Sequence, residues 1–150
     1  MNTDRSIKEI MTTKLVTVLP DTPVSEVKKI FNKHTFHHLP VVDMTGALEG
    51  IISKEDFLKL AYLLSKNTGG KTYSEKQYNS LTAKEVMTKY PISLEPEDTI
   101  GLAADIFLAN RFHALPILDD QILVGLVTTH DLLQYSFNLH TSSEEYELFI

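Results

Sequence analysis

A hydroxyl side chain followed three residues later by an aspartate occurs twice in this chain, each time after a glycine and two aliphatic residues. The first copy, GIISKED, contains Ser53 and Asp56, and the second, GLVTTHD, contains Thr128 and Asp131. At this spacing the hydroxyl can accept a hydrogen bond from a backbone N–H group, and the acid lies near the positive end of a helix dipole. Both motifs therefore predict the start of a helix.

The same helix starts could also bind a ligand. Free N–H groups and a hydroxyl at a helix N-terminus suit a phosphate, and an aspartate with two acceptor oxygens suits the paired hydroxyl groups of a ribose. A cap and a nucleotide site are compatible, because a ligand can use the groups of the cap. The glycines in front, Gly50 and Gly125, would let a backbone or a base approach closely, which capping alone does not require.

The two motifs belong to a longer internal repeat. The segment that begins at Glu9 aligns with the one that begins at Glu85, and FHHLP from Phe36 aligns with FHALP from Phe112. The second copy then lacks one residue, where DMTGALEG faces DDQILVG, as expected for a change in a turn. Such self-similarity predicts two copies of one structural unit.

Each copy predicts the same series of elements. Capping-box spacing in Ser6 with Glu9, and in Thr82 with Glu85, predicts a short helical turn. The elements that follow are a short strand (16–18 and 92–94), an amphipathic helix (starting near 21 and 97), a hairpin (39–42 with 48–52, and 115–118 with 122–127) and a last helix from Ser53 or Thr128.

We therefore predict an α+β fold of two β-α-β-β-α repeats, packed as a pseudo-two-fold pair. Repeat 1 spans residues 1–64, a polar linker follows at 65–81, repeat 2 spans 82–138, and an acidic C-terminal tail occupies 139–150. A repeat of about 55 residues buries too little surface to be securely stable alone, which favours packing of the two copies.

Composition excludes several classes of function. The chain has no cysteine, which excludes disulfides and thiol chemistry and favours a reducing compartment, so we expect a cytoplasmic protein. A formal charge of −6 without a basic patch argues against nucleic-acid binding. No segment approaches the ~20 apolar residues of a membrane span, so we expect no membrane insertion.

The order of the motifs resembles that of a tandem pair of CBS domains, the family named after cystathionine β-synthase. A Met-Thr opening, a Pro-Asp or Pro-Glu before the first helix, FHxLP before the hairpin and then the glycine-to-aspartate motif occur twice in this order, over about residues 6–64 and 82–138. The resemblance implies a stand-alone pair of CBS repeats, known as a Bateman module. It also implies two related clefts that bind adenosine-containing ligands such as AMP, ADP, ATP or S-adenosylmethionine.

The resemblance further implies one residue for each part of the ligand in each repeat. The aspartate would hold the ribose hydroxyl groups, and the serine or threonine would face the phosphate. An aliphatic residue at the start of the first strand would meet the adenine ring, and a histidine before the Leu-Pro step would lie towards the phosphates. In this order, the residues are Asp56, Ser53, Val16 and His37 in the first repeat, and Asp131, Thr128, Ile92 and His113 in the second.

The chain departs from family members that bind polyphosphates, which often carry arginine near the Leu-Pro step. It has His38 there in one copy and Ala114 in the other, with Arg111 two residues before His113. Imidazole is mostly neutral at pH 7 and attracts phosphate weakly. We therefore expect a nucleotide with few phosphates, AMP before ATP, acting as a regulatory ligand rather than as a catalytic cofactor.

Two alternative sites and one alternative function compete with this interpretation. His34, His37 and His38 could bind a metal, but no carboxylate lies close in sequence to complete the site, so we expect none. No catalytic signature accompanies the motif acids, so we expect no enzyme activity. The alternative to a nucleotide sensor that remains open is a ligand-free dimeric interaction module.

Partners follow from the same reasoning. Four amphipathic helices for two short sheets leave apolar helix surface outside the core, and CBS pairs commonly form two-fold dimers, so we expect a homodimer. The regulated partner would be an enzyme or a transporter.

Overall fold

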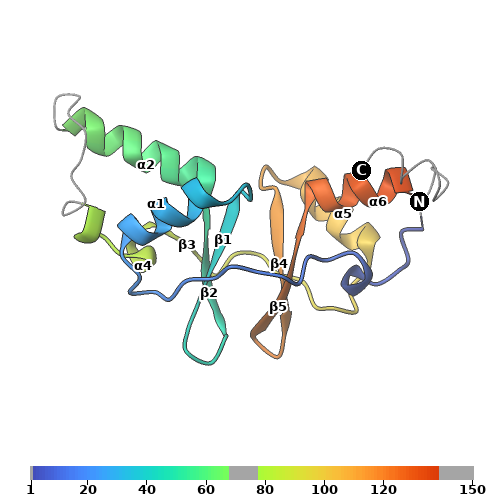
Figure 1. The fold of residues 1–150 in the computed structure, drawn as a ribbon. Helices are drawn as coiled ribbons and strands as arrows, with labels where there is room; N and C mark the ends of the chain where they lie inside the picture. The colour runs from blue at the N-terminus through green and yellow to red at the C-terminus, as the bar shows by residue number, and fades with distance from the viewer. Residues whose placement is uncertain (1, 68–77, 139–150) are drawn as a thin grey trace. The chain divides into compact units, whose positions relative to one another are not determined.

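The computed structural model describes residues 2–67 and 78–138 (Figure 1). They fall into two compact units, one of Val16–Pro91 and one of Met1–Leu15 with Ile92–Ile150. Each unit therefore combines the opening segment of one sequence repeat with the later elements of the other. The predicted mixture of helices and small sheets is confirmed. The predicted tail, and residues 68–77 of the predicted linker, lie outside the described residues.

The unit of residues 16–91 holds a three-stranded antiparallel sheet. The predicted hairpin is present, with His38 paired to Ser53 at its open end. A further short strand, which the sequence did not predict, pairs with the hairpin at Gly50 and Ile51. The elements in chain order are α1 (Val24–Lys33), β1 (His38–Val42), β2 (Leu48–Ser53), α2 (Lys54–Asn67), α4 (Ala83–Val86) and β3 (Thr88–Lys89).

The other unit is built around a two-stranded antiparallel hairpin. Its turn is shorter than the first, as predicted: only Asp120 and Gln121 separate the strands, with φ angles of 48° and 72°. Two positive φ angles are typical of two-residue turns whose twist matches that of the flanking strands. The elements are the 3-10 helix η1 (Ile7–Glu9), α5 (Ile100–Ala109), β4 (Ala114–Asp119), β5 (Ile122–Thr128) and α6 (Thr129–Asn138).

In both units, the chain at the opening segment forms a hydrogen bond with the start of the first long helix. The N–H group of Val24, at the start of α1, donates to the carbonyl of Leu81 (2.9 Å). The equivalent N–H group of Ile100, at the start of α5, donates to the carbonyl of Arg5 (2.9 Å). Because the first turn of a helix leaves N–H groups without partners inside the helix, these bonds stabilise both helix starts.

The strands predicted at 16–18 and 92–94 are wrong. Each is reduced to a single parallel bridge, at Val18 and at Leu94. Val18 donates to the carbonyl of Pro40 (3.1 Å) and Leu94 to that of Pro116 (2.9 Å). Since proline has no N–H group to donate in return, the ladder cannot extend towards the start of either segment.

The capping boxes predicted for the two short helical turns are also wrong, although both turns form, as η1 and α4. Neither Ser6 nor Thr82 makes a side-chain cap hydrogen bond. The Ser6 hydroxyl instead donates to the carboxylate of Glu97 (3.3 Å), and the carboxylate of Glu9 accepts from Arg5 (2.8 Å). The side chains of Ser6 and Glu9, which a capping box would pair with the backbone, therefore bind neighbouring charged side chains instead.

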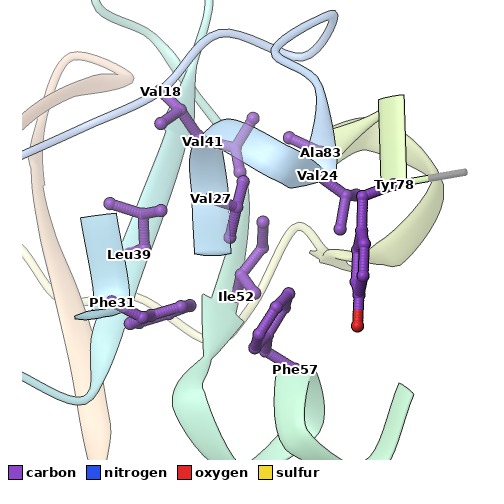
Figure 2. Packing of buried hydrophobic residues seen from close by; sticks show 10 residues of the cluster. All are labelled: Val18, Val24, Val27, Phe31, Leu39, Val41, Ile52, Phe57, Tyr78 and Ala83. Carbon is purple, nitrogen blue, oxygen red and sulfur yellow. The ribbon is translucent and has the colours of Figure 1, made fainter. Parts of the chain in front are cut away.

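Each unit has its own cluster of buried apolar residues. In residues 16–91 the cluster includes Phe31 and Phe57, whose ring centroids are 5.8 Å apart. Figure 2 shows its members, which are Val18, Val24, Val27, Phe31, Leu39, Val41, Ile52, Phe57, Tyr78 and Ala83. The cluster of the other unit consists of Ile7, Leu94, Ile100, Ala103, Phe107, Leu115, Ile117 and Val127.

Tyr78 lies in the predicted linker but belongs to the buried cluster of residues 16–91. Its side chain is 7% exposed, and the ammonium of Lys28 lies 4.7 Å from its ring centroid. The next residue, Asn79, accepts a hydrogen bond from the buried hydroxyl of Ser25. Residues 78 and 79 are therefore anchored to α1.

Within the two described ranges, no helix combines the length and the apolar character needed to cross a membrane.

Candidate functional site

Both predicted helix starts are formed, and the predicted hydroxyl caps are confirmed. The N–H group of Asp56 donates to the Ser53 hydroxyl (3.0 Å) at the junction of β2 and α2. The N–H group of Asp131 donates to the Thr128 hydroxyl (3.1 Å) at the junction of β5 and α6. Each hairpin thus runs directly into a helix whose first turn offers a hydroxyl, a carboxylate and backbone N–H groups. This set of groups can hold a phosphate beside a diol.

The two carboxylates differ in their surroundings. The half-buried Asp131 carboxylate accepts from the N–H group of Thr128 (2.9 Å) and from the hydroxyl of Thr12 (3.4 Å). The Asp56 carboxylate is exposed and accepts no hydrogen bond from the described residues, 2–67 and 78–138. No described donor therefore competes with a ligand for the Asp56 carboxylate, whereas a ligand at Asp131 would share the carboxylate with the helix start.

The two histidines before the Leu-Pro steps lie at the same helix starts. The carbonyl of His37 accepts from the N–H group of Lys54 (2.7 Å), and the carbonyl of His113 accepts from that of Thr129 (3.1 Å). Both imidazoles are on exposed residues. The structure therefore brings His37 next to the Ser53 junction and His113 next to Thr128, and it gives their backbones a role in starting α2 and α6.

The predicted adenine-contacting residues, Val16 and Ile92, have no hydrogen bond that joins them to these helix starts. Their positions follow from the parallel bridges two residues later, at Val18 and Leu94. Because the pairing is parallel, the chain before Val18 runs towards the start of β1, which is the end of the hairpin that holds Ser53. Val16 is half-buried against the core, whereas Ile92 is 52% exposed.

The two glycines of the motif contact methionines of the exchanged opening segments. A Cβ atom on Gly125 would lie 2.5 Å from the Met11 sulfur, and one on Gly50 would lie 2.7 Å from both Met87 Cγ and the Thr88 carbonyl oxygen. The close approach expected at the glycines is therefore made by the protein chain itself. Met11 and Met87 belong to the repeated Met-Thr opening. Because each methionine packs against a motif glycine, the Met-Thr opening and the glycine recur together in both repeats.

The three histidines considered as metal ligands, His34, His37 and His38, do not form one site. The ring of His34 stacks on that of Phe36, with centroids 4.9 Å apart. Among the described residues, no group of three or more metal-ligating side chains converges. Of the cluster, only His37 and His38 border the start of α2.

Comparison with known proteins decides the family. The profile of the CBS domain matches residues 7–62 and again residues 83–138. This chain belongs to the CBS domain family. A CBS domain-containing protein of Dictyostelium discoideum is 31% identical over 131 residues, which cover 85% of this chain and 88% of that protein. An uncharacterized protein of Methanocaldococcus jannaschii is 31% identical over 150 residues and is covered to 89% of its length.

Solved CBS structures share the fold over most of the chain. The Arabidopsis thaliana protein CBSX2, in a crystal structure with AMP, has a TM-score of 0.76 and 26% identity, covering 91% of this chain and 99% of CBSX2. The CBS domain pair of protein MJ0100, in complex with 5-methylthioadenosine and S-adenosyl-L-methionine, has a TM-score of 0.69 and 26% identity, covering 91% and 98%. Both CBS relatives were thus solved with an adenosine compound.

Proposed function

We propose that this CBS pair is a regulatory module that binds an adenine nucleotide, with AMP as the preferred ligand, and that it has no catalytic activity of its own. The observation that supports this most directly is the exposed Asp56 carboxylate, which stands without a hydrogen-bonding partner among the described residues at a capped helix start. A carboxylate in this state is ready to accept both hydroxyl groups of a ribose. The adenosine compounds bound by CBSX2 and MJ0100 point to the same chemical class.

In the proposed complex, each repeat supplies one set of residues. Asp56 accepts the ribose hydroxyl groups, Ser53 and His37 lie towards the phosphate, and Val16 contacts the adenine ring. The second set, in the same order, is Asp131, Thr128, His113 and Ile92. AMP is preferred to ATP because the groups near the phosphate are a hydroxyl, backbone N–H groups and an imidazole, without an arginine at the Leu-Pro step.

A thermal-unfolding experiment with AMP tests this proposal. A ligand that binds only the native protein raises its stability, by about 2.7 kcal/mol at a hundredfold excess over Kd. For a chain of this size, that corresponds to a rise in Tm of several degrees. Asp56→Ala should remove part of the rise, whereas Glu55→Ala, a matched change of the preceding acidic residue, should leave it unchanged.

Two outcomes would count against the nucleotide proposal. The first is a Tm that does not move with AMP, ADP, ATP or S-adenosylmethionine at millimolar concentration, which would favour the ligand-free interaction module. The second is an equal loss of the Tm rise in Asp56→Ala and Glu55→Ala, since the two carboxylates would then be equivalent.

We also propose that the module is a cytoplasmic homodimer that regulates an enzyme or a transporter. Support for self-association comes from large apolar side chains on the outer surfaces of two helices. Leu58 and Tyr62 of α2 are 57% and 67% exposed, and their counterparts in the repeat, Leu133 and Phe137 of α6, are 57% and 62% exposed. Light scattering at micromolar concentration should give the mass of two chains, and the mass of a single chain would contradict this.

A further inference from the structure

The hydroxyl of Thr12 contacts both oxygens of the Asp131 carboxylate. It donates to them over 3.4 Å and 3.5 Å. A hydroxyl that is almost equidistant from the two oxygens stands across both acceptors of the carboxylate. A ribose diol that binds Asp131 uses the same two oxygens, so Thr12 and such a ligand compete for them.

The backbone holds Thr12 at this position. The N–H group of Thr12 donates to the carbonyl of Leu126 (2.8 Å), and the N–H group of Leu126 donates to the carbonyl of Thr12 (2.9 Å). The preceding residue, Met11, lies against Gly125. Thr12 is therefore fixed beside β5, and its hydroxyl can leave Asp131 by rotation of the side chain while these backbone bonds stay in place.

Asp131 also forms a reciprocal cap at the start of α6. The N–H group of Asp131 donates to the Thr128 hydroxyl (3.1 Å), and the Asp131 carboxylate accepts from the Thr128 N–H group (2.9 Å). These two bonds have the pattern of a capping box. Together with the Thr12 contact, they orient the carboxylate towards groups of the protein itself.

The equivalent threonine of the other repeat, Thr88, makes no such contact. Its backbone pairs with Ile51 of β2, as that of Thr12 pairs with Leu126 of β5. Across residues 2–67 and 78–138, however, neither Thr88 nor another donor binds the Asp56 carboxylate. The two sites therefore share one backbone arrangement and differ in whether a threonine hydroxyl occupies the aspartate.

We propose that Thr12 is a positioning residue that lowers the affinity of the Asp131 site, so that the chain binds AMP first at Asp56 and at Asp131 only at a higher concentration. This inference rests on the proposed nucleotide function and adds the order in which the two sites are occupied. A ligand at Asp131 gains less, because the carboxylate must first give up the hydrogen bond from Thr12.

The same contact couples the Asp131 site to the opening segment of repeat 1. Thr12 belongs to that segment, so withdrawal of its hydroxyl removes one of the contacts between the segment and α6. By linkage, a ligand that weakens this contact is itself bound more tightly when the contact is absent. Removal of the Thr12 hydroxyl should therefore strengthen binding at Asp131.

Isothermal titration calorimetry with AMP tests the order of the sites. The original chain should show two classes of site, with one site of each class per chain, and their Kd values should differ by about tenfold. Asp131→Ala should weaken the weaker class further, whereas Asp56→Ala should weaken the tighter class.

Thr12→Val tests the role of the hydroxyl, because valine has nearly the same shape and keeps the pairing with Leu126. In the Asp56→Ala background, it should tighten AMP binding at Asp131 about three- to tenfold. Thr12→Ser retains a hydroxyl and should bind as the original does. The matched control is Thr88→Val, which in the Asp131→Ala background should leave the Kd within about twofold.

A measurement without nucleotide tests the contact itself. In urea denaturation, the effects of Thr12→Val and Asp131→Ala on stability should not add, because either change alone removes the contact. The effects of Thr88→Val and Asp56→Ala should add, because these two side chains share no bond. Circular dichroism shows whether each variant is folded.

Three results would overturn this inference while nucleotide binding itself stands. They are two sites of equal affinity in the original chain, weaker AMP binding after Thr12→Val, and additive effects of Thr12→Val and Asp131→Ala on stability. Weaker binding would mean that the hydroxyl holds the ligand instead of competing with it. No binding of AMP at millimolar concentration would overturn the proposed function, and this inference with it.

Discussion

Replacing the two motif glycines with alanine should have unequal effects on stability. Both glycines are buried, and a Cβ atom on either would lie closer than 3.0 Å to atoms of an opening segment. At Gly125 all three near neighbours are side-chain atoms of Met11, at 2.5, 2.9 and 3.2 Å. At Gly50 the neighbours include the backbone carbonyl oxygen of Thr88 at 2.7 Å. A methionine can rotate, but a paired strand must shift as a whole.

The magnitudes follow from this difference. Overpacking a well-packed site costs about 1–3 kcal/mol, and replacing glycine with alanine returns about 0.4–1 kcal/mol by restricting the unfolded chain. We expect Gly50→Ala to lower the free energy of unfolding by about 2 kcal/mol, because Thr88 is held in β3 by its pairing with Ile51. Gly125→Ala should cost less than about 1 kcal/mol, because Met11 can yield.

Urea denaturation followed by circular dichroism measures both effects, provided that the m-value is unchanged. A double-mutant cycle adds a control. Met11→Ala should cancel the cost of Gly125→Ala, whereas Met87→Ala should relieve Gly50→Ala only in part, since the Thr88 oxygen remains. An equal or larger cost at Gly125 than at Gly50, or full rescue of Gly50→Ala by Met87→Ala, would refute this reasoning.

Three further predictions concern the helix starts and the ion pairs. Ser53→Ala and Thr128→Ala each remove a cap and should lower the free energy of unfolding by about 1 kcal/mol, measured in urea, with Thr128→Ser close to the original. Asp131→Ala should also cost about 1 kcal/mol, because its carboxylate accepts from Thr128, whereas Asp56→Ala should change stability by less than about 0.5 kcal/mol; equal costs would contradict the asymmetry between the two sites. The pKa of Glu97 is lowered by a hydrogen bond from Lys8. A pKa lowered in the folded state adds stability above the unfolded-state value of ~4.3 that is lost as the pH falls through the folded-state value. The urea midpoint should therefore drop as the pH falls below about 4.3, and it should drop less in Lys8→Ala.

The repeated pattern of the sequence was sufficient for the main elements of the fold. Apolar spacing located α1 and α5, turn residues located the two hairpins, and the motif from Gly50 to Asp56 located the start of α2. These signals are local, so they do not depend on how the two copies are joined. The hydroxyl caps at Ser53 and Thr128 were predictable for the same reason.

The features that were missed depend on contacts between segments far apart in the chain. An alignment of the repeats is the same whichever opening segment binds which hairpin, so the exchange of these segments left no trace in the pattern. The short strand β3 and the burial of Tyr78 follow from that exchange. In the sequence, the proline of the Leu-Pro step was used only as a family signal. In the structure this proline also limits the strand predicted at 16–18, because it has no N–H group to donate to that segment.

The two helix starts and their hydroxyl caps were predictable from the sequence, but the difference between the two aspartates was not. Asp56 and Asp131 occupy equivalent places in the motif, yet only Asp131 is engaged by Thr12 and by the N–H group of Thr128. The two motifs differ in their hydroxyl residue, Ser53 in one and Thr128 in the other, and in the residues around it. None of these differences predicts the additional hydrogen bonds of Asp131.

The most direct test of the central claim compares AMP with 2′-deoxy-AMP by isothermal titration calorimetry. If the helix-start aspartates hold the ribose diol, AMP should bind about 10–100-fold more tightly, since a hydrogen bond to a charged group is worth about 1.5–3 kcal/mol. In the Asp56→Ala/Asp131→Ala double variant, the two ligands should bind almost equally. An unchanged preference for AMP in that variant, or no binding of AMP by the original chain at millimolar concentration, would contradict the account.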